Sequence, residues 1–236
     1  MRLDKFLCEM QIGTRSEVKD IIKKSQITVN GEIIKKADLK IDETKDRICY
    51  QGKELIFKAF HYYMLHKPAG VITATQDKND KTVMDLLPAI AGKKLSPVGR
   101  LDKDTEGLLL ITDDGELAHN LLSPKKHIDK TYYVKCKGKL KDESVSVLET
   151  GVDIGDDKPT LPAKVTVLEK NDEDYILELT ITEGRFHQVK RMIQAIDGEV
   201  TYLKRLSMGA LQLDPELPLG AFRELTQEEV EMLKNR

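Results

Sequence analysis

The chain has 236 residues, of which 40% are hydrophobic and 33% charged, a balance typical of a folded globular protein rather than a disordered one. Its 38 basic and 40 acidic side chains leave a net charge of −2, so the overall charge gives no sign of a nucleic-acid partner. No apolar run approaches the roughly 18 residues that cross a bilayer, and the first residues show no apolar signal segment. Three widely spaced cysteines argue against a disulfide framework or a cysteine zinc site. We therefore expect a cytoplasmic protein without membrane contact.

Two short helices are predicted at the start of the chain. Apolar residues at helical spacing predict the first over residues 3–10. Thr14 and Glu17 have the spacing of a capping box, which predicts a second helix over residues 15–24. Three basic side chains recur every fourth residue along it and share one face: Arg15, Lys19 and Lys23. Such a stripe suits RNA phosphates, although a solvated helix face has the same pattern.

A small hairpin follows these helices. Asn30-Gly31, within residues 27–34, is a strong signal for a two-residue turn, and a third strand is predicted near residues 46–50. The order of helix, helix and hairpin resembles the S4 RNA-binding domain. The resemblance implies docking on structured RNA and adds Arg2 and Lys5 to the candidate RNA contacts.

The charge is unevenly distributed along the chain. Residues 1–58 carry 13 basic and 10 acidic side chains, a net of +3, whereas the remainder carries 25 and 30, a net of −5. The basic first part agrees with an RNA-binding module, but ordinary surface variation produces differences of this size. We expect two domains, an S4-like domain over 1–57 and a catalytic domain over 58–236.

The second domain is predicted to be α+β, with a mixed, largely antiparallel sheet flanked by helices. Strands are predicted over residues 61–66, 70–74, 108–112, 131–137, 163–168 and 174–181. Helices are predicted over residues 82–87, 115–122, 141–149, 187–196 and 227–234, the last beginning with a capping box.

A polar loop in this domain runs directly into an apolar strand. Residues 99–107 read GRLDKDTEG and are followed by LLLIT. Polar loops at strand ends commonly hold reactive groups on a rigid scaffold. An Asp-rich turn that satisfies local N–H groups has the same composition. The local chemistry leaves both interpretations open.

Four sequence blocks resemble the RsuA-type pseudouridine synthases. They are GRLDxxTxGLLL from Gly99, YMLHKPAG from Tyr63, KTY from Lys130 and EGRFHQVKRM from Glu183. They lie in the family's order over residues 61–225, behind the S4-like module. The resemblance implies isomerisation of uridine to pseudouridine in ribosomal RNA, with no cofactor and no metal. FHQVKRM is more similar to the enzymes that modify 16S RNA than to those that modify 23S RNA.

The resemblance also assigns site residues. Asp102 is the essential carboxylate, for attack on C1′, attack on the base, or removal of a proton from C2′. A neighbouring cation should keep it ionised; Lys190 aligns best and Arg191 is the alternative. Tyr132 offers a ring on which the flipped uracil stacks, although a strand tyrosine alone also suits core packing. Arg100 is a candidate because it is close to Asp102 in sequence: it could fill the gap left by that base, hold a phosphate, or form a structural salt bridge.

Further basic residues of the second domain are expected to meet RNA, which makes binding salt-dependent. The predicted RNA contacts are Lys67, Arg185 and Arg191. A local basic cleft around the essential carboxylate is predicted from Lys67, Arg100, Arg185, Lys190, Arg191, Lys204 and Arg205. The expected partner of this monomer is 16S ribosomal RNA or a small-subunit assembly intermediate.

Three other functions are compatible with parts of the sequence. A 23S-specific enzyme of the same family and a non-catalytic RNA-binding or ribosome-assembly protein share the motifs. The pairs Asp102 with Asp104 and Asp113 with Asp114 suggest a glycosidase, but carboxylates so close in sequence rarely flank a sugar. The lone histidines and Cys136 are interpreted as structural.

Overall fold

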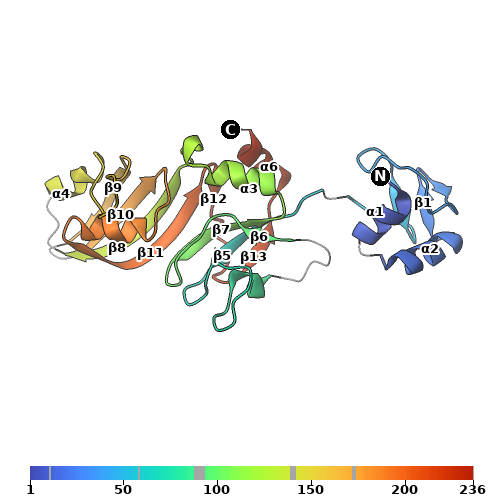
Figure 1. Cartoon of the computed structure of the whole chain (residues 1–236), viewed down its shortest axis with the longest axis horizontal. Coiled ribbons are helices and arrows are strands. Elements are labelled where there is room, and N and C mark those ends of the chain that lie inside the picture. Colours follow the sequence, from blue (N-terminus) through green and yellow to red (C-terminus); the bar gives the residue numbers. More distant parts are fainter. Residues whose placement is uncertain (11, 58, 88–93, 139–141, 172–173, 236) are drawn as a thin grey trace. The chain divides into compact units, whose positions relative to one another are not determined.

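The computed structural model describes residues 1–235 except 11, 58, 88–93, 139–141 and 172–173 (Figure 1). The chain divides into two units. The first is built on Met1–Ala59, and the second on Phe60–Pro88 and Lys94–Arg236. None of the described helices is long and apolar enough to cross a membrane.

The first unit packs two helices on a small antiparallel sheet. Its elements are α1 (Leu3–Glu9), α2 (Arg15–Lys23), β1 (Ile27–Val29), β2 (Glu32–Ile33), β3 (Ile48–Tyr50) and β4 (Lys53–Glu54), with strand order β2-β1-β3-β4. The predicted capping box is confirmed, since Thr14 N–H donates to Glu17 and Glu17 N–H donates back to the Thr14 hydroxyl. The predicted hairpin turn is also confirmed, with positive φ at Asn30 and Gly31. Fully buried apolar residues from both helices and from β1 and β3 form the core, among them Phe6, Ile22 and Ile48.

The second unit is built on one mixed sheet with helices beside it. In sheet order the main strands are β13 (Phe222–Glu224), β5 (Tyr62–Lys67), β7 (Glu106–Thr112), β11 (Gly198–Met208), β8 (Lys130–Gly138), β10 (Asp174–Ile181) and β9 (Lys164–Lys170); β6 (Ser96–Pro97) pairs with β7, and β12 (Leu211–Gln212) with β11. Only β7 and β11 pair in parallel among these strands. The α+β class with a mixed, largely antiparallel sheet is therefore confirmed.

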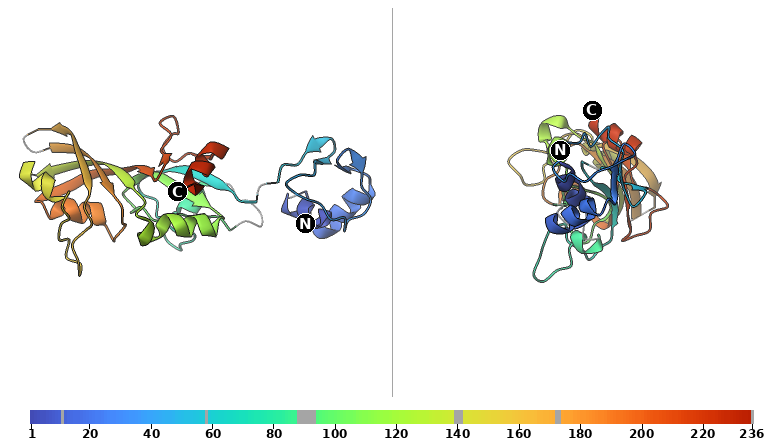
Figure 2. Two further views of the ribbon diagram at one scale, coloured as in Figure 1. Left: turned by 90° about the horizontal axis from the view of Figure 1, so that it is seen from above. Right: turned by 90° about the vertical axis from the view of Figure 1, so that its right-hand side faces the viewer.

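Helices lie alongside this sheet (Figure 2). They are α3 (Gly115–Leu122), α4 (Asp142–Val147), α5 (Gln188–Gln194) and α6 (Gln227–Lys234), with 3₁₀ turns η1 (Val83–Leu86) and η2 (Pro124–Lys126). In Figure 2, α3 (green) and α5 (orange) lie on the same side of the sheet. The predicted helix over 82–87 is thus a 3₁₀ turn, and the first residue of the helix predicted over 141–149 lies outside the described residues.

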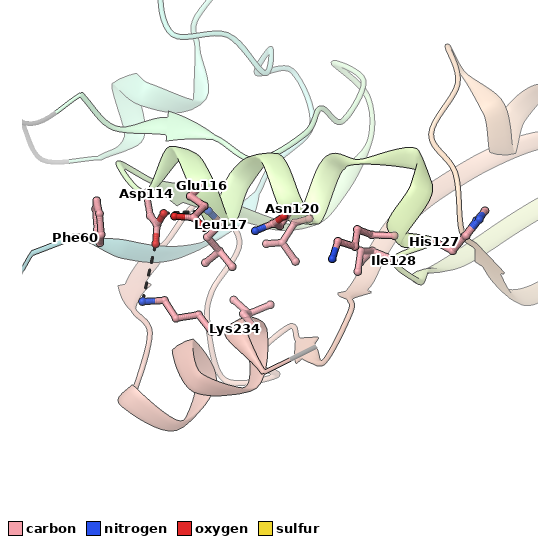
Figure 3. A pocket seen from close by; sticks show the side chains of 11 residues that line it. Phe60, Asp114, Glu116, Leu117, Asn120, His127, Ile128 and Lys234 are labelled. Atoms are coloured by element: carbon pink, nitrogen blue, oxygen red, sulfur yellow. Dashed lines mark hydrogen bonds and ion pairs between the residues drawn. The ribbon is translucent and has the colours of Figure 1, made fainter.

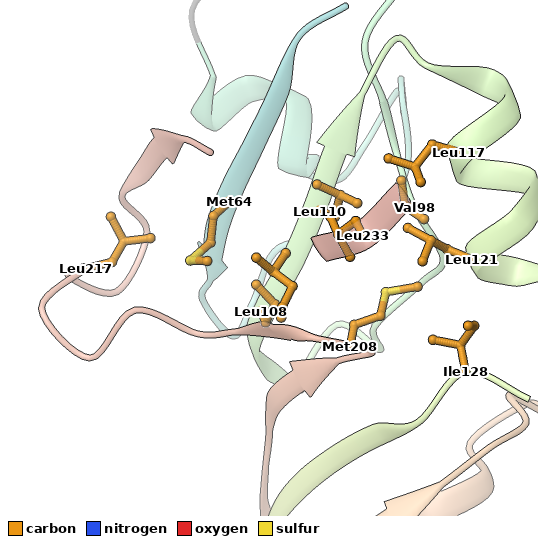
Figure 4. Close-up of a cluster of buried hydrophobic side chains, with 11 residues drawn as sticks. Met64, Val98, Leu108, Leu110, Leu117, Leu121, Ile128, Met208, Leu217 and Leu233 are labelled. Carbon is orange, nitrogen blue, oxygen red and sulfur yellow. The ribbon is translucent and has the colours of Figure 1, made fainter. Parts of the chain in front are cut away.

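The core of this unit gathers around β7 (Figure 4). Leu108 and Leu110 pack with Met64 of β5, Leu117 of α3 and Leu233 of α6. Every residue from position 107 to 112 is buried, so β7 is covered on both faces. This explains why its sequence is a continuous apolar run rather than an alternating one.

Besides missing the short strands β6, β12 and β13, the sequence prediction was wrong about two segments. Residues 70–74 are not a strand: Gly70 N–H donates to the carbonyl of Lys103 at 2.7 Å, and Thr73 hydrogen-bonds to Leu101, so this segment bonds to the 99–107 loop instead of a strand ladder. The prediction also missed β11, the longest strand, which lies at the centre of the sheet between β7 and β8.

Gly107 permits the close pairing of β7 with β11. Its φ is +107°, and a Cβ placed there would lie 2.2 Å from the carbonyl oxygen of Arg205. An approach this close to backbone atoms forces the two strands apart. The residue that joins the 99–107 loop to the sheet must therefore be glycine.

Gly107→Ala is expected to destabilise the second unit by about 3 kcal/mol or more, because it adds both a clash and an unfavourable φ. Gly155→Ala is the matched control: its φ is +80°, but no atom lies within 4 Å of its added Cβ, so a loss of about 1 kcal/mol is expected. Urea unfolding of the full chain measures both. Equal losses would contradict the role assigned to the β7–β11 contact.

Candidate active site

A buried lysine fixes the 99–107 loop. Lys67, at the end of β5, has an exposed fraction of 0%. Its Nζ donates to the carbonyl oxygens of Asp102 at 2.9 Å, Thr105 at 2.8 Å and Pro68 at 3.1 Å. Burial lowers the pKa of Lys67 to about 8, against the opposing influence of the Asp104 and Asp102 carboxylates. The ammonium thus acts as an internal anchor for the loop.

A threonine holds the loop from a second direction. The Thr73 hydroxyl donates to the carbonyl of Leu101 at 2.8 Å and accepts from the Leu101 N–H at 3.1 Å. Thr105 N–H donates to the carbonyl of Asp102 at 3.1 Å, which closes a turn. The backbone on both sides of Asp102 is therefore fixed, and the carboxylate extends from a rigid support.

Asp102 meets a cation from α5. Lys190 Nζ lies 3.2 Å from Asp102 Oδ2 and 2.6 Å from Asp104 Oδ1. His187 Nε2 lies 3.6 Å from the other oxygen of Asp102. The Asp102 side chain is 28% exposed, so it is sheltered yet open to a ligand. The arrangement presents a partly buried carboxylate with its charge balanced on one side.

The charge of Lys190 is stable at neutral pH. Burial by itself lowers the pKa of Lys190, but hydrogen bonds and charge from Asp104 and Asp102 outweigh it, and the net pKa is raised. The same ammonium lowers the pKa of Asp104, mainly through its hydrogen bond. Lys190 therefore remains an ammonium, suited to stabilise negative charge and unsuited to accept a proton.

Arg191, the sequence alternative for this contact, points elsewhere. Its guanidinium pairs with Asp156 and donates to the carbonyl of Ile154 at 3.1 Å from Nε. Neighbouring helical residues project about 100° apart, so only one of the two faces Asp102. In this structure that residue is Lys190.

Tyr132 lies at the same end of the sheet. Tyr132 of β8 pairs with Arg205 of β11, which pairs with Gly107 at the start of β7. Two strand spacings therefore separate the Tyr132 backbone from the end of the loop, roughly 10 Å. Tyr132 is 8% exposed. Arg100 is exposed and makes no ion pair with the described residues, so its guanidinium is available to a ligand.

Several predicted RNA contacts are used inside the protein instead. Lys67 is a wrong prediction, because its ammonium is enclosed by carbonyl oxygens. Arg185 donates to the carbonyls of Lys158 and Pro159 and pairs with Glu183. Arg205 is 1% exposed; its Nε donates to Leu108 at 2.8 Å and its Nη2 has no partner among the described residues. With Arg191 also paired, the predicted cleft loses four of its seven basic side chains.

The basic stripe on the first unit is accessible. Arg15, Lys19 and Lys23 are all exposed along α2. Arg2 and Lys5 are exposed too, and each has an acidic neighbour, Asp4 and Glu9 respectively.

Sequence reasoning missed two residues beside Asp102. They are His187 and Asp104. His187 comes directly before α5, three positions before Lys190, so spacing from the assigned lysine was a usable signal. Asp104 shares the Lys190 ammonium at 2.6 Å, a contact across 86 residues that no local pattern indicates. Among the described residues, no group of histidine, cysteine or acidic side chains could hold a metal.

The second unit has a pocket of about 470 Å³ elsewhere (Figure 3). It lies beside α3 and α6 and includes Phe60, Asp114 and Lys234. Asp114 caps α3 and accepts a hydrogen bond from Tyr62 at 2.7 Å. Asp113 accepts from the His61 N–H at 2.6 Å, so both members of the acidic pair have a structural role. No residue of the 99–107 loop lines this pocket.

Comparison with known proteins identifies the two units. A family model described as RNA pseudouridylate synthase matches residues 61–195, and an S4 domain model matches residues 1–48. The chain is therefore an S4-domain protein with a pseudouridine synthase unit. It belongs to the RNA pseudouridylate synthase family, as the resemblance of its motifs implied.

Whole-chain relatives support this assignment. RNA pseudouridine synthase YtzG of Bacillus subtilis is 46% identical over 99% of this chain and 98% of its own length. Ribosomal small subunit pseudouridine synthase A of Vibrio vulnificus is 40% identical, and that of Escherichia coli K12 is 38% identical, each covering 98% of both chains. A solved structure of a pseudouridylate synthase has a TM-score of 0.69 and 38% identity, covering 99% of both chains.

Lys67→Met is expected to lower the free energy of unfolding by about 2 kcal/mol at pH 7, because the loop carbonyls lose their donor. The loss should grow from pH 8 to 10.5. In the wild type the folded pKa of Lys67 is about 8 and the unfolded value is 10.5, so between these pH values the unfolded chain binds one more proton than the folded chain. Wild-type stability therefore rises by about 1.4 kcal/mol per pH unit in that window, and Lys67→Met, which lacks the amine, does not share this rise.

Urea unfolding across pH measures this difference. The control is Lys164→Met, since Lys164 is exposed on β9 and pairs only weakly with Asp129 at 3.7 Å; its profile should parallel the wild type. A Lys67→Met profile that also runs parallel to the wild type would show that Lys67 does not titrate as a buried anchor.

Proposed function

We propose that the chain converts a uridine of 16S ribosomal RNA in the small subunit to pseudouridine. The single observation that carries the proposal is the Asp102 carboxylate, held by a fixed loop 3.2 Å from the Lys190 ammonium. The target is inferred from relatives named ribosomal small subunit pseudouridine synthase A, which match over 98% of this chain.

Asp102 is proposed as the reactive group. The reaction breaks the bond between N1 of uracil and C1′ of ribose, turns the base and joins C5 to C1′; C5 releases its proton and N1 takes one up. Attack on C1′, attack on the base and proton removal from C2′ all require the carboxylate form. The Lys190 ammonium lies 3.2 Å from Asp102, where it can stabilise negative charge during the reaction. Both residues act without a change of oxidation state.

Tyr132 and Arg100 are proposed to receive the RNA. A uridine in folded RNA must leave its stack before it reaches a carboxylate. The ring of Tyr132 then provides an aromatic face for the uracil. Arg100, exposed two positions before Asp102, is placed to occupy the gap in the RNA or to pair with a phosphate.

The two domains are proposed to divide the work. Residues 1–57 bind structured RNA through the exposed stripe of Arg15, Lys19 and Lys23, with Arg2 and Lys5 beside it, and residues 58–236 isomerise the uridine. Phosphate contacts make this binding weaken as salt rises. We propose a monomer acting in the cytoplasm. A purely RNA-binding role is disfavoured, because a binder has no need of a sheltered carboxylate paired with the partly exposed Lys190 ammonium.

The wild-type protein is expected to release tritium from 16S RNA carrying [5-³H]uridine, because forming the C5 bond expels that hydrogen. Naked 16S RNA, small-subunit particles and 23S RNA are assayed in parallel. Release from 16S RNA or from the particles, with none from 23S RNA, is expected. Release from 23S RNA alone would contradict the proposed target, and release from none of the three would contradict the activity.

Two matched variants test the chemistry in the same assay. Asp102→Asn should lower the rate at least ~1000-fold, while the Kd for RNA stays within about threefold because no phosphate contact is removed. Asp104→Asn is the control, since Asp104 also pairs with Lys190 but is 72% exposed; its rate should stay within about tenfold of wild type. Equal losses in both variants would contradict the assignment of Asp102.

A further inference from the structure

Phe186 is an exposed aromatic ring with one open face. It is 75% exposed, the highest value among the large hydrophobic side chains of the described residues. Its ring stacks on His187, with centroids 3.8 Å apart and planes inclined by 18°. One face of the phenyl ring is therefore covered by the imidazole, and the exposure comes from the other face and the edges.

The stacked pair leads from the surface to the reactive carboxylate. His187 Nε2 lies 3.6 Å from Asp102 Oδ1, so the imidazole touches the site while the phenyl ring lies beyond it. His187 has a φ of +47°. A non-glycine residue in this left-handed region is uncommon, and such strain concentrates at functional sites.

Buried polar contacts keep the loop that carries Phe186 in place. Gln188 is 3% exposed; its Oε1 accepts from the Arg185 N–H at 2.9 Å, and its Nε2 donates to Glu183 at 2.9 Å. Arg191 Nη1 donates to the carbonyl of Phe186 itself at 3.1 Å. The ring is thus mounted on a braced support, which reduces the entropy lost when a ligand stacks on it.

We propose that Phe186, backed by His187, is a stacking platform for an unpaired nucleobase adjacent to the target uridine. This rests on the proposed function. A lone exposed phenylalanine is common on protein surfaces. Phe186 differs because its ring stacks on His187, which borders the site, and because hydrogen bonds fix its backbone. Unpaired RNA bases are commonly bound by stacking on aromatic side chains.

The geometry also selects which base stacks there. The reacting uridine must reach Asp102, which lies 3.6 Å from Nε2 at the edge of the His187 ring. The open face of Phe186 points away from His187, so the base that meets it belongs to a neighbouring nucleotide. Pulling the target uridine out of the stack leaves its neighbours without a partner, and the platform replaces that lost stacking. Phe186 thereby acts in substrate binding, and the bond-breaking steps do not involve it.

The test uses two short RNAs that contain the uridine converted by the wild-type protein, still unmodified. One carries 2-aminopurine at the nucleotide before this uridine, and the other carries it at the nucleotide after. Stacking on an aromatic ring quenches 2-aminopurine fluorescence. All titrations use the full chain carrying Asp102→Asn, so that binding is read without turnover. The protein otherwise unchanged should quench one of the two probes. Phe186→Ala should lose that quenching and weaken binding about tenfold, and Phe186→Trp should restore both.

Phe60→Ala is the matched control. Phe60 is also an exposed phenylalanine of this unit, at 43%, but it lines the pocket of Figure 3 at the other end of β5 from Lys67. Its removal should change neither quenching nor affinity. Single-turnover rates are then measured in the chain that retains Asp102. There, Phe186→Ala should need a higher RNA concentration for half-saturation, while its rate at saturating RNA stays within about threefold of wild type.

Two failures are distinguishable. Unchanged quenching and affinity in Phe186→Ala overturn the platform while wild-type pseudouridine formation leaves the proposed function intact. Absence of pseudouridine formation by the wild type overturns the proposed function and, with it, the platform that rests on it. A fall in the saturating rate without a change in affinity also overturns the platform.

Discussion

The buried ammonium of Lys67 is the constraint on which the site depends. A charge enclosed in protein is unfavourable unless polar groups surround it, and here the carbonyl oxygens of the 99–107 loop supply them. The loop cannot move away without leaving that charge unpaired, so Asp102 is held where α5 brings Lys190 within 3.2 Å. Gly107 completes the constraint by letting β7 approach β11 closely. The position of the carboxylate thus comes from the sheet beneath it, and its charge balance comes from Lys190 of α5.

Local signals in the sequence predicted local structure well. The helices over 115–122 and 227–234 and the turn at Asn30-Gly31 have the predicted bounds or register, because caps and turn residues act within a few positions. The missed strand β11 and the wrong strand over 70–74 depend on pairing between distant segments. Residues 70–74 bond to the loop at 101–103, and a window of sequence does not contain that partner.

The same limit applies to the candidate site. Resemblance to a family assigned Asp102 and Lys190. Neighbouring helical residues point about 100° apart, so Lys190 and Arg191 cannot both face Asp102, but this spacing does not say which of them does. The structure adds Asp156, which engages Arg191. Lys67 was predicted at the RNA surface because a lysine at a strand end has the same sequence appearance whether solvent or carbonyl oxygens surround it. Burial, which distinguishes the two, depends on the whole fold.

The positive charge of Lys190 on α5 lies 3.2 Å from the carboxylate that we propose as the reactive group. The most direct measurement is the single-turnover rate of pseudouridine formation, at saturating RNA, for Lys190→Met and Lys190→Arg. Loss of the charge should slow Lys190→Met at least ~100-fold, while Lys190→Arg, which keeps the charge, should remain within about tenfold of wild type. A Lys190→Met rate within twofold of wild type would contradict the account.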